Sequence, residues 1–152
     1  MKAAPTLDGR IRIDVESPLD RMILHAIPHD ARTAGVDLAE RLGDVMDEDG
    51  GKEDWNDYVL PDLREDFNDQ LTTIEEALTG LEAEKPEPIF ILKEDAETWY
   101  GGLNQARLAL EERYHFHDEE PEEMTPGKRS AFFRSHFYQT LQSLLLEFLM
   151  RD

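Results

Sequence analysis

The chain has 152 residues, of which 39% are hydrophobic and 34% charged, and its formal net charge at pH 7 is −19. This length predicts a single domain over residues 1–152 that buries about two thirds of the surface its unfolded chain exposes. So negative a chain is not expected to bind nucleic acid or anionic membranes, because binding to either depends on Lys and Arg side chains. No apolar run approaches the roughly 20 residues that span a bilayer.

The cysteine content and the charge distribution further limit the possible kinds of site and the expected cellular location. The absence of cysteine excludes disulfides, thiolate metal sites and cysteine nucleophiles. The first ten residues lack the apolar segment of a secretory signal, so we expect a cytoplasmic protein. Residues 37–88 carry eighteen acidic and four basic side chains, whereas residues 125–152 carry two acidic and four basic. The acidic middle indicates either a well-solvated surface or a surface for a basic protein partner.

The N-terminal part predicts a strand followed by a helix. Apolar and polar residues alternate over 9–15, which is the pattern of a half-buried strand. Ser17 and Pro18 are typical of an N-cap and a first helical position, so a helix is expected to begin there. Pro28 is expected to end this helix.

A second short helix is predicted over 36–45, with Leu38, Leu42 and Val45 facing inward. An acidic, glycine-containing loop is predicted after it, over 47–54.

The segment after this loop is apolar, and we expect a short helical turn packed against the core through Trp55, Tyr58, Val59 and Leu60. The clearest helix of the chain follows Pro61, because its apolar side chains recur every three or four residues. These side chains are Leu63, Phe67, Leu71, Ile74, Leu78 and Leu81.

The C-terminal half predicts a short strand at 89–92, a helix at 94–114, an acidic loop at 115–124 and a last helix that begins at Thr125. The two strands are expected to pair, since a lone strand would leave its backbone groups without partners. The predicted fold is therefore mainly α, a helical bundle of about four to five helices with a minor two-stranded β element.

The helix at 94–114 and the last helix each have a clear apolar side. In the first, the inward positions are Ala96, Trp99, Leu103, Ala106 and Leu110. In the second, a wide stripe comprises Phe133, Phe137, Leu141, Leu144, Leu145, Phe148 and Leu149. The core or a second copy of the chain must cover that stripe, so a homodimer through the C-terminal helix is one hypothesis.

No pattern in the sequence predicts a catalytic residue, a cofactor or a metal. The acidic loop over 47–54 fails the EF-hand pattern, because neither of its glycines places an acid at the first ligand position. His115 and His117 supply fewer ligands than a zinc site requires.

The most unusual segment lies in the predicted helix before the second acidic loop. Gly101 and Gly102 interrupt the helical pattern, where each costs about 1 kcal/mol relative to alanine. Close approach of another helix or of a ligand would compensate. Asn104 and Arg107 share a face of this helix. With Trp99 they form either a polar pocket for a peptide terminus or carboxylate, or a packing contact with another element.

The pattern Ala96-x-x-Trp99, followed by Gly102 to Leu110 and by Arg113, resembles the central helix of a bacterial domain-of-unknown-function family. That family is encoded beside the Clp-protease adaptor ClpS in actinobacteria, and its order of elements is similar over most of the chain. Family members usually end this helix with a glycine-containing turn, which residues 114–117 lack. The resemblance implies a cytoplasmic protein linked to regulated proteolysis, and it transfers no catalytic residue and no cofactor.

Two functional hypotheses follow. The first is a non-enzymatic helical interaction or regulatory protein with an acidic face and an unidentified protein partner. The alternative is a small-ligand or metal-binding protein that uses the helix face over 99–107.

Overall fold

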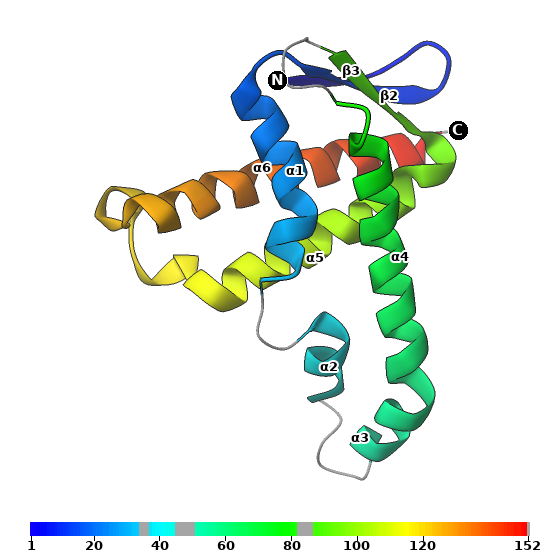
Figure 1. Ribbon diagram of the computed structural model, residues 1–152, viewed down its shortest axis with the longest axis vertical. Coiled ribbons are helices and arrows are strands. Elements are labelled where there is room, and N and C mark those ends of the chain that lie inside the picture. The colour runs from blue at the N-terminus through cyan, green and yellow to red at the C-terminus, as the bar shows by residue number, and fades with distance from the viewer. Residues whose placement is uncertain (34–36, 45–50, 82–86, 152) are drawn as a thin grey trace.

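A three-stranded antiparallel sheet lies at one end of the molecule (Figure 1). The computed structural model describes residues 1–33, 37–44, 51–81 and 87–151. The sheet order is β1-β2-β3, with β1 at Lys2–Pro5, β2 at Arg10–Val15 and β3 at Glu87–Leu92. The register places Ile13 opposite Ile89 and Ile11 opposite Ile91. The predicted pairing of the two strands is thereby confirmed.

The edge strand β1 was not among the predicted elements. Most of its side chains are exposed, so it lacks the apolar alternation that marks a half-buried strand. Pro5 has no N–H to donate and is tolerated at a sheet edge. Gly9 has a φ of 84° in the turn that leads to β2, a conformation that glycine adopts without a Cβ clash.

Helices form most of the remaining structure, which confirms the mainly α class. Their bounds are α1 Pro18–Ala31, α2 Leu38–Gly43, α3 Gly51–Asp54, α4 Leu60–Leu78, α5 Ala96–Tyr114 and α6 Pro126–Met150. A π-helical turn, η2 (Trp55–Val59), joins α3 to α4. Short 3-10 turns are η3 (Lys93–Asp95), η4 (Phe116–Asp118) and η5 (Pro121–Glu123). In Figure 1, α5 and α6 run across the molecule, α1 and α4 cross them, and α2 and α3 lie at the end of α4 away from the sheet.

The core forms where the inner face of the sheet meets α1, α4, α5 and α6. The predicted inward positions of α5 are all buried there. Side chains that are at most 2% exposed include Ile11, Ile13, Leu24, Ile27, Ile74, Leu78, Ile91, Trp99, Leu103, Leu110, Leu141 and Leu145.

The helix α1 does not end at Pro28 as predicted, because it continues to Ala31. Proline removes its own hydrogen bond and crowds the carbonyl of the preceding turn, but the residues after it keep their N–H groups and can stay helical. Arg32 N still donates to Pro28 O at 3.2 Å.

The helix α2 is shorter than predicted, and its inward side differs. Leu42 is 40% exposed, whereas Ala39 and Gly43 are buried. A Cβ on Gly43 would overlap the indole of Trp55, so small residues allow this close packing. Val45 lies outside the described residues.

The acidic loop and the turn that follows it differ from expectation in two ways. Residues 51–54 are helical as α3, and residues 47–50 lie outside the described part of the chain. Trp55 is half-buried, but Tyr58 is 75% exposed and Val59 is 39% exposed. The prediction that Tyr58 and Val59 pack against the core is wrong, because α2 at this end of α4 covers Trp55 and not the opposite face.

The capping prediction for α6 is confirmed, since Thr125 Oγ1 accepts a hydrogen bond from Lys128 N at 3.4 Å. Its buried face is rotated from the predicted stripe, and Phe133 is 59% exposed. Polar Tyr138 and Gln142 lie on the buried face because both have internal hydrogen-bond partners. The residues buried along α6 are Ala131, Tyr138, Leu141, Gln142, Leu145 and Phe148.

A buried ion pair fastens α1 to α6. The Asp30 carboxylate, 1% exposed, accepts hydrogen bonds from Arg134 Nε at 2.8 Å and Arg134 Nη2 at 3.0 Å. The Tyr138 hydroxyl donates to the same carboxylate at 2.6 Å. Every group of this buried cluster is therefore paired, as burial requires.

Alkaline pH is expected to destabilise the protein through Tyr138. Burial, followed by the neighbouring Asp30 charge, raises the pKa of Tyr138 far above its usual value of about 10. The Tyr138 phenol stays neutral in the folded state but ionises in the unfolded state above its usual pKa. The stabilisation that Tyr138 contributes is therefore fully present below pH 10 and is lost as the pH rises above 10. Between pH 8 and 11 the wild type should lose about 1.4 kcal/mol more than Tyr138→Phe in urea unfolding. Equal losses in the two proteins would contradict this account.

The two glycines of α5 lie where α4 comes closest. A Cβ on Gly102 would overlap the terminal methyl of Ile74, and a Cβ on Gly101 would overlap the Gln70 amide. The side-chain oxygen of the same residue, Gln70 Oε1, also accepts a hydrogen bond from Gln105 Nε2 at 2.8 Å. Close helix packing therefore explains the glycines, as one of the two hypotheses predicted.

Gly102→Ala is expected to lower the free energy of unfolding by about 1–3 kcal/mol through overpacking, although alanine is the better helix former. Ile74→Val removes the clashing methyl, so the double variant should lose less than the sum of the two single losses in chemical denaturation. Gly80 has open space around its Cα, and Gly80→Ala is the control that should cause no loss. Additive losses would show that the contact is not the cause.

Candidate functional site

Two of the three predicted site residues line one cavity. Asn104 and Arg107 face a space of about 390 Å³ between α5 and α6. Trp99 is not among its lining residues and is 1% exposed in the core. The structure therefore brings Asn104 and Arg107 together and separates them from Trp99.

The cavity is lined by two helices and by the turn η4. Both walls show the spacing of one helix face, with positions three, four and seven residues apart. The α5 wall comprises Asn104, Arg107, Leu108 and Glu111; the α6 wall comprises Phe132, Ser135, His136 and Gln139; Phe116 and His117 of η4 complete the lining. Polar groups thus face an aromatic and aliphatic surface within the same space.

The Arg107 guanidinium is held from one side by α6. Arg107 Nη1 donates to Gln142 Oε1 at 2.5 Å, and Gln142 Nε2 donates to Tyr100 O at 3.3 Å. Gln142 is only 3% exposed, so its orientation is fixed. Arg107 Nε is buried and has no acceptor within the described part of the chain. An unpaired buried donor costs about 1–3 kcal/mol, so this arginine retains hydrogen-bonding capacity that the fold does not use.

The η4 part of the lining depends on how α5 ends. His115 adopts a left-handed conformation with a φ of 48°, which reverses the chain direction after α5. Phe116 is consequently buried and packs edge-on to Phe132 with ring centroids 5.6 Å apart. His117 remains exposed, and its Nε2 lies 3.4 Å from Glu111 Oε1. Of residues 114–117, where a glycine-containing turn was expected, Phe116 and His117 therefore line the cavity.

Sequence reasoning did not find the α6 wall. His136 stacks edge-on to Phe132 at 4.4 Å, yet neither residue was predicted to share a site with Asn104. The polar face formed by Ser135, His136 and Gln139 was visible in the sequence. Only the packing of α6 against α5 shows that it faces Arg107.

Within residues 1–33, 37–44, 51–81 and 87–151, no three His, Cys, Asp or Glu side chains are grouped so that they could hold a metal ion. None of the helices described there is long and apolar enough to cross a membrane.

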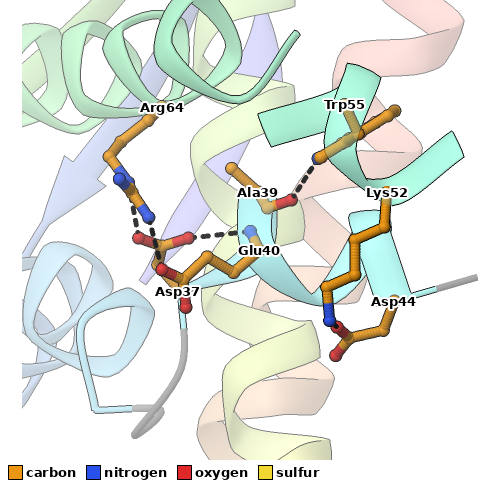
Figure 2. A network of polar contacts seen from close by, with 7 residues as sticks. All are labelled: Asp37, Ala39, Glu40, Asp44, Lys52, Trp55 and Arg64. Carbon is orange, nitrogen blue, oxygen red and sulfur yellow. Dashed lines mark hydrogen bonds and ion pairs between the residues drawn. The ribbon is translucent and has the colours of Figure 1, made fainter. Parts of the chain in front are cut away.

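A second polar region lies at the far end of α4. We call residues 37–44 and 51–70 the acidic arm; Figure 1 shows α2, α3 and the adjoining part of α4 projecting away from the sheet. Trp55 Nε1 donates to Ala39 O at 3.1 Å and joins η2 to α2 (Figure 2). Arg64 Nε lies 2.7 Å from Asp37 Oδ2, and Arg64 Nη2 lies 2.8 Å from Glu40 Oε1. The hydrogen bond to Asp37 is the main reason that the pKa of Arg64 is raised.

All three basic residues of the arm form ion pairs. Besides Arg64, Lys52 Nζ lies 2.9 Å from Asp44 Oδ1 and Arg41 Nη2 lies 3.5 Å from Glu112 Oε2. Seven acidic side chains of the arm have no cation partner among the described residues. They are Glu53, Asp54, Asp57, Asp62, Glu65, Asp66 and Asp69.

Comparison with known proteins identifies the family. The family model described as a domain of unknown function, DUF2017, matches residues 5–149. The chain belongs to this family. The expected membership of a domain-of-unknown-function family is thereby confirmed. Searches of curated proteins and of solved structures find no match.

This DUF2017 chain also has an apolar groove of about 500 Å³ between the first turns of α1 and α6. Leu19, Met22 and Phe133 line it and are each 56–59% exposed. The groove shows where the apolar stripe of α6 remains uncovered, while Tyr138, Leu141 and Leu145 pack inside.

Proposed function

We propose that this DUF2017 chain is a non-enzymatic interaction protein that binds a basic protein partner through its acidic arm. The observation that carries the proposal is the charge pairing of the arm. All three of its cations are ion-paired, Arg41 with Glu112 of α5 and the other two within the arm, and seven acids are left without a cation among the described residues. Such a field accelerates and orients the approach of a basic surface.

Helix electrostatics support the same proposal. Asp62, Asp66 and Asp69 are spaced four and three residues apart on α4, and like charges at these spacings destabilise a helix. Bound cations would relieve this repulsion. Tyr58 is 75% exposed and lies four residues from both Asp54 and Asp62. Tyrosine is enriched at protein interfaces, so it would supply the apolar contact that an acidic surface alone lacks.

A narrower proposal follows from the resemblance described above. We propose that the partner belongs to the machinery of regulated proteolysis in the cytoplasm, with the adaptor ClpS as the first candidate to test. The support for this step is the genomic neighbourhood associated with the family. A homodimer through the C-terminal helix α6, which leaves Leu146 and Met150 exposed near its end, is a separate proposal about assembly.

Reversing the charge of the arm is expected to abolish partner binding. A variant with Asp54→Lys, Asp57→Lys and Asp62→Lys should recover at least tenfold less partner from native cells. The reversed charges remove the electrostatic attraction that guides a basic partner to the arm, and they repel its cations at the interface. The matched control carries Glu122→Lys, Glu123→Lys and Glu147→Lys, three exposed acids outside the arm.

Recovery is measured by quantitative affinity purification, and binding of purified ClpS by titration at low and high salt. Equal recovery by the arm variant and its control would contradict the proposal. Light scattering of the same samples reports mass, and a monomer at all concentrations would remove the homodimer.

A further inference from the structure

The cavity between α5 and α6 has the composition of a small-ligand site. Its volume of about 390 Å³ lies within the range of about 300–1,000 Å³ that is usual for such sites. Asn104, Arg107, His136 and Gln139 contribute polar groups, while Phe132 and two further side chains contribute apolar surface. Mixed lining of this kind fits a ligand with one polar end and one apolar end.

The polar end is set by Arg107. Gln142 fixes Arg107 Nη1 from outside the cavity lining, so the guanidinium is preorganised before a ligand arrives. Its Nε–H has no acceptor in the described part of the chain. The Asn104 side chain makes no hydrogen bond to another described residue. The two side chains lie one helical turn apart and offer donors without offering a second cation.

The charge of the surroundings selects among anions. A planar carboxylate matches the donor fork of one guanidinium. A phosphate dianion is disfavoured, because Glu111 lies at the same cavity and its lining, among the described residues, includes no lysine and no second arginine. The apolar end of the ligand would contact Leu108, Phe116 and Phe132.

We propose that this cavity binds a monocarboxylate attached to an apolar group, with Arg107 and Asn104 holding the carboxylate and Gln142 acting as a positioning residue. The ligand chemistry is shared by small apolar acids and by the C-terminus of a peptide with an apolar last residue. The proposal does not depend on the acidic arm, so the two can fail separately.

The first test compares two probes that differ only in the charged group. N-acetylphenylalanine should give a saturable signal in calorimetry, and its neutral amide should bind at least tenfold more weakly, the effect of losing a charge-assisted hydrogen bond. No binding of the acid at about 10 mM, or equal binding of acid and amide, overturns the proposal.

The second test locates the site. Arg107→Gln should weaken the acid at least tenfold, while Arg113→Gln should leave its affinity unchanged within about twofold. Arg113 is the matched control, because it lies on the same helix over the ring of Tyr114 and does not line the cavity. Ser135→Phe fills the cavity from the opposite wall and should block binding even if Arg107→Gln fails to fold. Undiminished binding by a folded Arg107→Gln or Ser135→Phe variant overturns the proposal.

A third comparison identifies the source of the carboxylate. A hexapeptide that ends in phenylalanine is titrated with a free and with an amidated C-terminus. Tighter binding of the free-ended peptide than of N-acetylphenylalanine supports peptide-tail recognition at this site. Binding of the small acid alone supports a small-molecule site. In both cases Arg107→Gln must weaken binding at least tenfold, and undiminished binding overturns the proposal.

Discussion

Replacing Arg134 by methionine is expected to lower the free energy of unfolding by about 3–5 kcal/mol, because it leaves the buried Asp30 carboxylate without its cation. Asp30 is 1% exposed, and the two Arg134 hydrogen bonds to it measure 2.8 and 3.0 Å. Methionine preserves most of the side-chain length, so the loss reports the charge and not a cavity. Urea denaturation followed by circular dichroism measures it.

An exposed ion pair between the C-cap of α1 and α4 provides the control. Arg32 Nη2 lies 2.7 Å from Glu75 Oε1, and both side chains are nearly half exposed. Exposed pairs contribute about 0–1 kcal/mol, so Arg32→Met should lose no more than that. If Arg134→Met and Arg32→Met destabilise the protein equally, burial of Asp30 is not the cause.

Trp99→Ala is expected to destabilise the protein by about 3–5 kcal/mol, the usual loss for truncating a buried tryptophan. The indole is 1% exposed among core residues from several elements. Because Trp99 does not line the cavity, a variant that still folds should bind N-acetylphenylalanine as the wild type does. Calorimetry tests that second expectation, and urea denaturation tests the first.

The other tryptophan of the chain serves as the comparison. Trp55 is only half-buried and fastens the acidic arm through Ala39 O. Trp55→Ala should therefore lose about half as much global stability or less, in proportion to the smaller area it buries. A larger loss for Trp55→Ala than for Trp99→Ala would contradict this assignment of Trp99 to the core.

The cavity shows how far sequence reasoning extends towards a site. Asn104 and Arg107 were predicted to share a face because their spacing on α5 is a local property of the helix. His136 and Phe132 belong to the same cavity but lie more than 20 residues away. No periodicity within one helix indicates which face of another helix it meets.

The glycines of α5 also show that the sequence predicts a close contact but not the residue that makes it. The sequence predicted that Gly101 and Gly102 needed a compensating close approach, since glycine is costly in a helix. It did not identify Ile74 of α4 as the side chain that approaches Gly102. That pairing depends on the crossing of α4 over α5.

Several features were determined by the local sequence alone, because each depends on residues within one or two helical turns or on the alternation of a single strand. They are the helix starts at Ser17-Pro18 and Thr125-Pro126, the alternation of β2, the inward face of α5 and the acidic character of the arm. Tertiary structure decided the rest. The buried face of α6 differs from the predicted stripe because Tyr138 and Gln142 have polar partners that lie 108 and 42 residues away in sequence, respectively. Asp30 could be buried only because Arg134 lies beside it, 104 residues further along the chain. Burial of a polar group depends on its partner, and the partner is chosen by how the helices cross.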